Sequence, residues 1–287
     1  MDVVADGSRM AGGRRRVRVD GGARVTLRDD AGTTRLVELW HHDPMRVLLP
    51  EPVDDEIPHV VLLNSAGGLV GGDSLRTEIG LGDRARALVT GQAAEKVYRS
   101  DGPDVAIRTS LSAGRDAWLE WMPQETILFE ASRLDRRLSI DLAAGARCLA
   151  GETLVFGRRA RGETIARAWL RDRWEIRREG RLAWADAFAL RPDEPGVLDA
   201  PFALDGAAAM ATLAYCGADA PARLEGLREA LAGHGAGIAA SCLGDILRVR
   251  GLSRDAQALR RAVAEAWRFL RAAGGSLPAR LPRLWHI

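Results

Sequence analysis

The feature that most constrains this chain is a series of short segments, between residues 17 and 199, in which apolar and polar residues alternate. Successive side chains of a β-strand point to opposite faces, so this alternation predicts strands with one buried and one solvated face. The segments are Val17–Asp20, Ala23–Arg28, Arg35–Trp40, Met45–Leu49, His59–Leu63, Ala85–Thr90, Asp104–Leu111, Ala117–Trp121, Leu138–Leu142 and Thr164–Leu170. Turn-forming residues separate them, and no long helical pattern intervenes. We expect a mainly β fold of layered sheets.

The last third of the sequence has a different pattern. Leucines at helical spacing predict a helix over Ala222–Ala232, and Ile246–Arg250 predicts a strand. The tail over residues 277–285 contains two prolines, which cannot continue a helix, so we expect an extended strap. No internal sequence repeat is present in the chain.

The clearest helical signal covers Arg254–Ala273. Ser253 or Asp255 supplies an N-cap, because either short side chain can accept a hydrogen bond from a free amide of the first turn. The pair Gly274-Gly275 follows and is expected to end the helix. The apolar residues that form one stripe along it are Leu259, Val263, Trp267 and Leu270.

The charges are nearly balanced, with 41 basic and 39 acidic residues and a formal net charge of +2. A general nucleic-acid binder needs a large cationic excess, so that class of function is disfavoured. Lysine occurs once, at Lys96, and arginine supplies every other basic side chain. A codon bias of the genome explains this preference.

The cysteines are few, odd in number and without a CxxC motif: Cys148, Cys216 and Cys242. They therefore do not predict the disulfide framework of a secreted protein. The N-terminus has no apolar run typical of a signal peptide, and no segment reaches the ~20 apolar residues of a membrane helix. We expect a cytoplasmic protein that binds no membrane. Residues 1–16 are expected to be a disordered lead-in to one domain over 17–287, β-rich over 17–205 and mixed over 206–287.

A glycine-rich segment, Asn64–Asp73, follows an apolar strand and raises the question of a phosphate-binding loop. Its paired glycines fit neither GxGxxG nor GxxxxGK[ST]. We interpret it as a tight corner between strands, where glycine allows positive φ and close backbone approach. Asp73 either caps this turn or directs a carboxylate into a polar interior.

Polar groups also gather in Thr90–Ser100, just after a predicted strand. Lys96 and Tyr98 are candidate acid–base residues, but no partner at a fixed spacing completes a catalytic site. A buried or interfacial hydrogen-bonded network is the alternative interpretation.

Two carboxylates, Glu120 and Glu125, suggest a different function. Paired carboxylates catalyse glycoside hydrolysis, and a β-rich chain suits a carbohydrate enzyme. The neighbouring Trp118 and Trp121 are expected on the strand face opposite Glu120, which makes them core residues rather than a sugar platform.

Metal-binding motifs are missing from the sequence. The adjacent His41 and His42 point to opposite sides of a strand, and no HExxH or CxxC motif is present. A tight metal site is therefore not expected, whereas the sequence is compatible with a transient, oxygen-lined path for an ion.

Five motifs, read in order, resemble the UreD (UreH) family of urease accessory proteins. They are His42–Pro50, Asn64–Asp73, Gln92–Ser100, Leu119–Phe129 and Glu152–Glu163, followed by the C-terminal helix and Leu281–Trp285. Each motif is short, but their order is specific, and together they extend over roughly residues 35 to 285.

The resemblance implies a mainly β fold of stacked, helix-like strand layers with C-terminal helices. It also implies a metallochaperone scaffold that is required for nickel incorporation into apo-urease. Such a scaffold binds UreF, the GTPase UreG through UreF, and the urease structural subunits. UreG hydrolyses GTP, so this chain need not be an enzyme, and Ni²⁺ passes through it transiently without a tightly bound cofactor.

The same resemblance implies polar positions on a nickel path or at a partner interface. These candidate residues are Asp73, Gln92, Lys96, Tyr98, Arg99, Glu120, Gln124, Glu152 and Glu163. Oxygen ligands hold Ni²⁺ more loosely than thiolates or clustered imidazoles, which suits an ion that must move on. The alternatives are a glycoside hydrolase that uses Glu120 and Glu125, and an assembly scaffold without a metal path.

Overall fold

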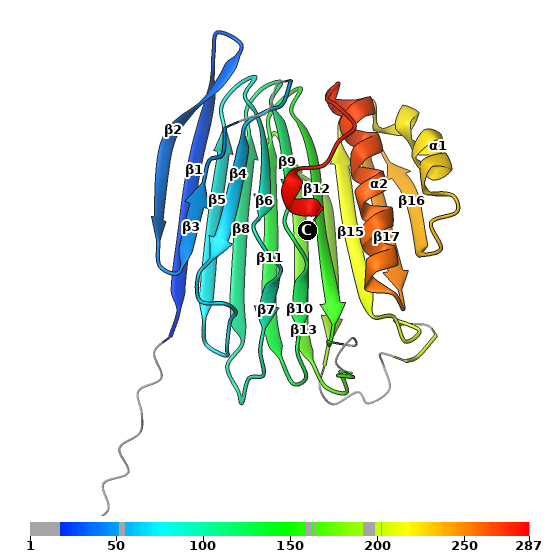
Figure 1. Cartoon of the computed structure of the whole chain (residues 1–287). Coiled ribbons are helices and arrows are strands. Elements are labelled where there is room, and N and C mark those ends of the chain that lie inside the picture. The colour runs from blue at the N-terminus through cyan, green and yellow to red at the C-terminus, as the bar shows by residue number, and fades with distance from the viewer. Residues whose placement is uncertain are drawn as a thin grey trace, which may run out of the picture.

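The structure, a computed structural model, describes residues 18–51, 55–158, 162–163, 165–191, 199–201 and 203–286. The lead-in expected over residues 1–16 lies outside them, and the division into domains stays a prediction. The described chain forms two large β-sheets that face each other, with two helices on the side of the second sheet (Figure 1).

Seven strands form the first sheet, which we call sheet A. Its central strands are parallel, and each edge adds one antiparallel strand. In spatial order they are β14 (Arg181–Leu190), β13 (Trp169–Arg178), β11 (Arg133–Leu142), β8 (Val105–Ala113), β5 (Ser74–Leu81), β1 (Asp20–Asp30) and β2 (Thr33–His42).

The second sheet, sheet B, also has a parallel centre. Its main path is β16 (Gly237–Leu243), β17 (Ile246–Ser253), β15 (Ala209–Cys216), β12 (Arg147–Phe156), β9 (Trp118–Met122), β6 (Arg86–Gly91), β4 (His59–Asn64) and β3 (Met45–Leu48). Two short strands, β7 (Glu95–Val97) and β10 (Thr126–Leu128), pair with each other, and β10 also pairs with the second half of β12.

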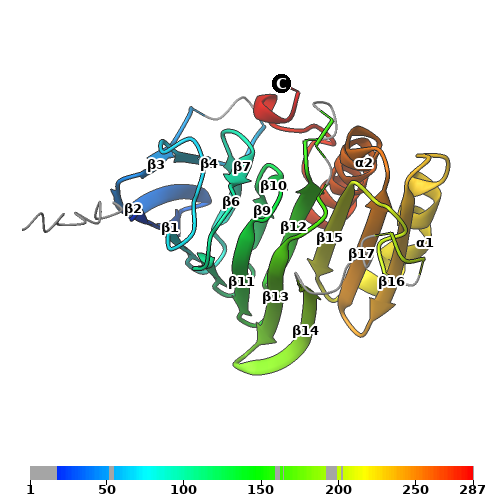
Figure 2. The same cartoon turned by 90° about the horizontal axis from the view of Figure 1, so that it is seen from below.

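The chain winds from one sheet to the other and back, so the two sheets are opposite walls of a β-solenoid (Figure 2). It passes from β5 to β6, from β8 to β9 and from β11 to β12. Each strand lies parallel to the strand one turn earlier. The expected fold of stacked, helix-like strand layers with C-terminal helices is confirmed.

Inward-facing aliphatic side chains hold these turns together. Ile79, Leu111, Ile140 and Ile176 occupy one register position on four neighbouring strands of sheet A, and all four are buried. Burying such a side chain contributes roughly 1.5–3 kcal/mol. Only inward positions must be apolar and outward positions are free to vary, so the structural repeat leaves no sequence repeat.

The strands that the sequence pattern missed are β5, β7, β10, β12, β14, β15 and β16. β12 and β15 lie in the middle of sheet B and are buried on nearly every residue, so they lack alternation. A strand covered on both faces cannot be recognised by period 2. The strand expected at Thr164–Leu170 begins only at Trp169.

The C-terminal helices pack against sheet B. Helix α1 (Ala220–Leu231) contacts β16 and β17, and α2 (Ala256–Gly275) contacts β15, β12 and β17. Asp255 caps α2, because its side chain accepts a hydrogen bond from the amide of Gln257 at 2.8 Å. The predicted stripe is buried on this side.

The two glycines expected to end α2 instead form its last turn. A Cβ at Gly274 would lie 2.5 Å from the Tyr215 hydroxyl, and one at Gly275 would lie 2.5 Å from the Trp118 ring. Close packing therefore requires glycine here. The left-handed residue that follows the helix is Ser276, with φ 50°.

A buried ion pair clamps α2 to the solenoid. Glu120, on β9, has no solvent exposure and lies 3.2 Å from Nε of Arg271, on α2. Its two oxygens also accept hydrogen bonds from the indoles of Trp118, at 2.8 Å, and Trp267, at 2.6 Å. Arg271 is in turn paired with Glu56. Burial raises the pKa of Glu120, and Arg271 opposes this shift.

The tail beyond α2 crosses sheet B and ends in a short 3₁₀ turn, Arg283–Trp285. Trp285 packs edge-on against Trp267, with ring centroids 5.0 Å apart. The Arg260 guanidinium lies 4.4 Å from the Trp285 ring centroid. Most of the tail is the expected strap, except for this final turn.

The clamp predicts a large effect of Glu120→Ala on stability. The change leaves two buried indole N–H groups and Arg271 without their acceptor, which costs roughly 3–5 kcal/mol. The free energy of unfolding, measured by denaturant titration, should fall by this amount. Glu225→Ala, which removes a pair on the surface of α1, should cost under about 0.5 kcal/mol. Equal losses in the two variants would contradict the clamp.

Candidate functional site

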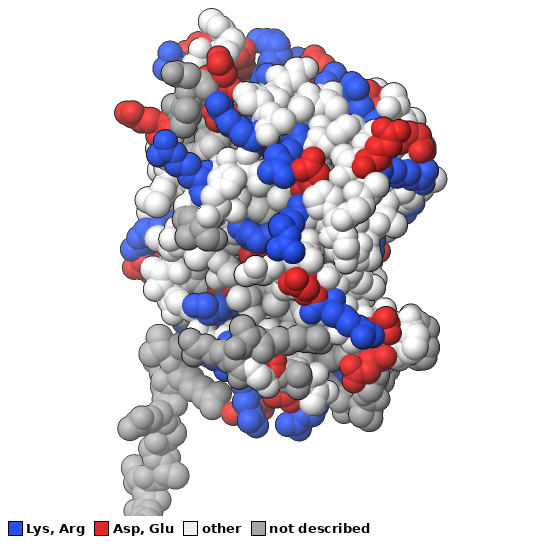
Figure 3. Space-filling model, turned by 45° about the vertical axis from the view of Figure 1, so that its right-hand side comes forward, with Lys and Arg blue, Asp and Glu red and all other residues white. Residues whose placement is uncertain are grey.

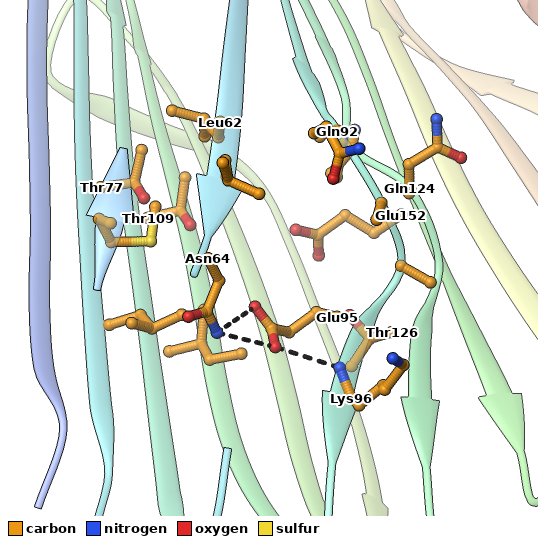
Figure 4. Close-up of a pocket in the computed structure, with 18 of the residues that line it drawn as sticks. Leu62, Asn64, Thr77, Gln92, Glu95, Lys96, Thr109, Gln124, Thr126 and Glu152 are labelled. Carbon is orange, nitrogen blue, oxygen red and sulfur yellow. Dashed lines mark hydrogen bonds between the residues drawn. The ribbon is translucent and has the colours of Figure 1, made fainter. Parts of the chain in front are cut away.

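A cavity of about 290 Å³ lies inside the solenoid, between the two sheets. Its polar lining residues are Asn64, Thr77, Gln92, Glu95, Lys96, Thr109, Gln124, Thr126, Arg136 and Glu152. Figure 4 shows Glu95 and Glu152 directed into the same space from neighbouring parts of sheet B. The interior is therefore polar here, although aliphatic side chains fill most of the solenoid.

The cavity lies where the ladder of sheet B is interrupted. Residues 92–94 separate β6 from β7, and residues 123–125 separate β9 from β10. Pro123 has no amide hydrogen for a ladder bond, which suits a break at this position. The two breaks are adjacent because β6 and β9 are neighbours. They leave loop side chains, including Gln92 and Gln124, at the wall of the cavity.

Sheet A contributes threonines at inward positions. Thr77 lies between Leu75 and Ile79 in the alternation of β5, and its neighbour in register on β8 is Thr109. Both side chains are buried. At the same register position the next strands carry apolar residues, Leu138 on β11 and Trp174 on β13, so the two hydroxyls make this part of the interior polar.

An ion cluster forms one end of the cavity. Arg136, on β11, donates to both oxygens of Asp172, on the adjacent strand β13, at 2.9 and 2.7 Å. Its Nε also lies 3.4 Å from Oε2 of Glu152. All three residues are at most 7% exposed. Although burial disfavours its charge, Asp172 and Glu152 raise the pKa of Arg136, so it stays a cation.

Glu152 has the less complete set of partners. Oε1 accepts a hydrogen bond from the Trp121 indole at 3.2 Å, whereas Oε2 accepts none from the described residues. Burial, with Asp172 nearby, raises the pKa of Glu152 to about 7, against the opposing effect of Arg136. This carboxyl therefore exchanges its proton near neutral pH.

Glu95 is the second carboxylate of the cavity. Its oxygens accept hydrogen bonds from the Asn64 side-chain amide at 3.1 and 3.0 Å, and one of them accepts from the Lys96 amide at 3.1 Å (Figure 4). Burial raises its pKa, while these hydrogen bonds favour the charged form. Glu95 lies within the polar segment Thr90–Ser100 but was not among the predicted site residues.

Gln124 links the cavity to the C-terminal strap. Its side-chain nitrogen donates to the Leu284 carbonyl at 2.9 Å, and its oxygen accepts from Arg260, on α2, at 2.9 Å. The wall of the cavity is therefore continuous with the surface formed by α2 and the tail.

Of the predicted residues, Gln92, Lys96, Gln124 and Glu152 line the cavity. Asp73 does not: its carboxylate accepts from the amides of Val19, at 2.9 Å, and Val70, at 2.8 Å, and so caps the glycine-rich corner. The capping alternative is thus confirmed for this residue.

Three further candidates lie away from the cavity. Tyr98 packs on Phe129 and donates to the Gly67 carbonyl at 3.2 Å. Arg99 contacts Asp101 on the surface. Glu163 accepts from Arg158 at 2.6 Å, and this contact lowers its pKa.

The geometry does not support the glycoside hydrolase. Glu120 is enclosed by two indoles and Arg271, and Glu125 is paired with Arg260. The prediction that both tryptophans lie opposite Glu120 was wrong for Trp118, which is two residues away, shares its face and donates to it.

Arg136 and Asp172 were not among the predicted residues, although the sequence carries a signal for both. Arg136 stands between Leu134 and Leu138, and Asp172 between Leu170 and Trp174, each at an inward position of an alternating strand. A charged residue at an inward position requires a buried partner.

The cavity offers carboxylate, amide and hydroxyl oxygens to a small cation. Among the described residues, no three His, Cys, Asp or Glu side chains come together as a metal-binding group. The carboxylates among the described lining residues are Glu95 and Glu152.

The raised pKa of Glu152 predicts a pH dependence of stability. The folded chain holds this proton more tightly than the unfolded chain, so its stabilising effect is complete below about pH 4.5 and is lost as pH rises through about 7. Glu152→Gln cannot titrate and keeps an acceptor for Trp121. When the pH is raised from 5 to 8, the unfolding free energy of the parent should therefore fall further than that of the variant. The difference between the two losses should be about 3 kcal/mol at most. Denaturant titrations at several pH values measure this, and identical pH profiles would refute it.

Comparisons with a family model and with known proteins all point to the same family. Residues 19–286 match the family described as UreD urease accessory protein. A urease accessory protein UreD of Magnetococcus marinus is 44% identical over 274 residues, 94% of each chain. The proteins of the same name from Granulibacter bethesdensis and a Methylobacterium species are 47% and 43% identical, over 83% and 89% of this chain and 99% and 90% of their own. The chain belongs to the UreD family of urease accessory proteins.

Proposed function

We propose that this protein is a metallochaperone scaffold that is required for nickel incorporation into apo-urease. In this role it binds UreF, UreG through UreF, and the urease structural subunits, and Ni²⁺ passes through its interior as cargo. The observation that carries the proposal is the polar cavity within an otherwise apolar solenoid, together with membership of the UreD family.

The ligand chemistry of the cavity favours transfer over storage. Burial raises the pKa of both Glu95 and Glu152, and that of Glu152 to about 7, so near neutral pH a proton competes with a cation for the Glu152 carboxylate. An entering Ni²⁺ displaces a proton, and reprotonation helps to release the ion. Amide and hydroxyl oxygens, such as those of Gln92 and Thr126, supply further weak contacts.

The position of the cavity fits a passage between partner surfaces. Part of its lining, Asn64 and Gly67, belongs to the glycine-rich segment Asn64–Asp73. Another part, Gln124, is bonded to α2 and the strap. We propose that these two regions lead to different partners, so that the ion crosses the solenoid between them.

The same proposal places the protein in the cytoplasm. The described cysteines are free thiols, which fits a reducing compartment. None of the described helices has the length and apolar character needed to cross a membrane.

The test is urease maturation in cells that lack the native accessory protein. Expression of this chain with urease and the other accessory proteins should restore nickel in purified urease, measured by elemental analysis, and urease activity. The double change Glu95→Gln and Glu152→Gln should lower the nickel content roughly tenfold, as expected for the loss of about 1.4 kcal/mol of cation stabilisation.

A matched control separates the passage of nickel from the assembly of the complex. Glu225 lies on the surface of α1, so Glu225→Gln should leave nickel loading unchanged. The complexes formed by the double variant should be recovered in normal amount. Full nickel loading by that variant would favour a scaffold without a metal path, and failure of the parent to restore urease would overturn the whole proposal.

A further inference from the structure

A row of arginines crosses the outer face of sheet A. Arg76 on β5, Arg108 on β8, Arg137 on β11 and Arg173 on β13 occupy one register position on four neighbouring parallel strands. Adjacent strands lie about 4.8 Å apart, so the row is about 14 Å long. Like charges directly opposite each other destabilise a sheet, so the row requires negative charge nearby to offset the repulsion.

The row is accessible. Both helices pack on sheet B, away from this face (Figure 2). Arg76 is exposed, and the side chains of Arg108, Arg137 and Arg173 are 36%, 42% and 35% exposed to solvent. An approaching molecule can therefore contact all four guanidinium groups.

Two carboxylates hold the guanidinium groups in place. Asp135 accepts from Arg108 at 2.6 Å and from Arg173 at 2.7 Å. Glu175 accepts from Arg137 at 2.7 Å and from Arg177 at 3.2 Å. Each carboxylate is shared by two arginines, so the row is ordered but not neutralised.

Two exposed arginines on this face, Arg76 and Arg171, keep their guanidinium groups available for an incoming carboxylate. Neither Arg76 nor Arg171 forms an ion pair with a described residue, and Arg171 instead lies 5.1 Å from the Trp169 ring centroid.

The local charge contrasts with the rest of the molecule. The outward positions of β5, β8, β11 and β13 hold seven arginines and four acidic residues, a difference of +3, whereas the whole chain has +2. They are Arg76, Arg108, Arg133, Arg137, Arg171, Arg173 and Arg177 against Glu78, Asp135, Asp141 and Glu175. On the face in Figure 3, by contrast, the two signs are mixed.

We propose that this arginine row is a docking surface for an acidic helix of a partner protein, laid across the strands of sheet A. Carboxylates at helical positions i, i+3 and i+4 are about 5–6 Å apart, which matches the spacing of the row. Same-face carboxylates of an extended segment are about 6.6 Å apart and match it less well. Planar carboxylates also accept paired hydrogen bonds from guanidinium groups.

A nucleic acid fits this surface less well. The row is short, and the nearly neutral chain supplies no long-range attraction for a polyanion. Interleaved Asp135 and Glu175 would also repel a continuous phosphate backbone, whereas a helix can place its carboxylates between them.

The test uses the full chain and a fluorescein-labelled helical peptide with glutamates at i, i+3 and i+4 along one face. Fluorescence anisotropy should show binding at about 50 mM salt that weakens strongly at about 300 mM. Arg76→Glu in the row, combined with Arg171→Glu two residues before Arg173 on the same face, reverses two charges without breaking an ion pair of the described residues and should raise Kd at least tenfold. Arg76→Gln with Arg171→Gln should raise it less, provided that both variants keep the parent's melting temperature.

The matched control is Arg254→Glu with Arg261→Glu, which reverses two exposed arginines outside sheet A. This variant should bind the peptide like the parent, and a peptide with glutamine in place of glutamate should not bind. Three results would overturn the proposal: no binding to the parent, equal loss in the control, or displacement of the peptide by a single-stranded oligonucleotide at lower concentration.

Discussion

The two walls of the solenoid share one interior, and this constraint governs the rest of the structure. Every inward position contacts the facing wall and the turns on either side, so aliphatic residues such as Ile79 and Leu111 stack from turn to turn. A polar residue at an inward position must then find its partner inside the protein. The threonines and charges around the cavity occupy such positions, which is why they form one connected polar region.

Two buried carboxylates illustrate how surroundings give the same chemical group different properties. Glu120 is enclosed by two indole donors and Arg271, and it joins α2 to the solenoid. Glu152 shares Arg136 with Asp172 and keeps one oxygen without a hydrogen bond from the described residues. The first carboxylate has no solvent exposure and is surrounded by donors from the protein. The second lines the cavity, and burial raises its pKa to about 7.

The solenoid also separates its interior from its outer surfaces. Alternation directs neighbouring residues of one strand to opposite sides, so β11 places Arg136 at the cavity and Arg137 in the outer arginine row. Charge changes on the outer face therefore need not alter the cavity. The two faces of one strand can therefore carry side chains with unrelated roles.

By itself, the sequence determined the mainly β class, most alternating strands, the Asp255 cap and the family motifs, because these depend on neighbouring residues. It also pointed to four residues of the cavity, Gln92, Lys96, Gln124 and Glu152. Only the tertiary structure decided that Arg136 meets Asp172, that Glu120 meets Arg271 and that four arginines align across sheet A. Those pairings depend on the register between turns of unequal length, and loop lengths set this register without any periodic signal in the chain.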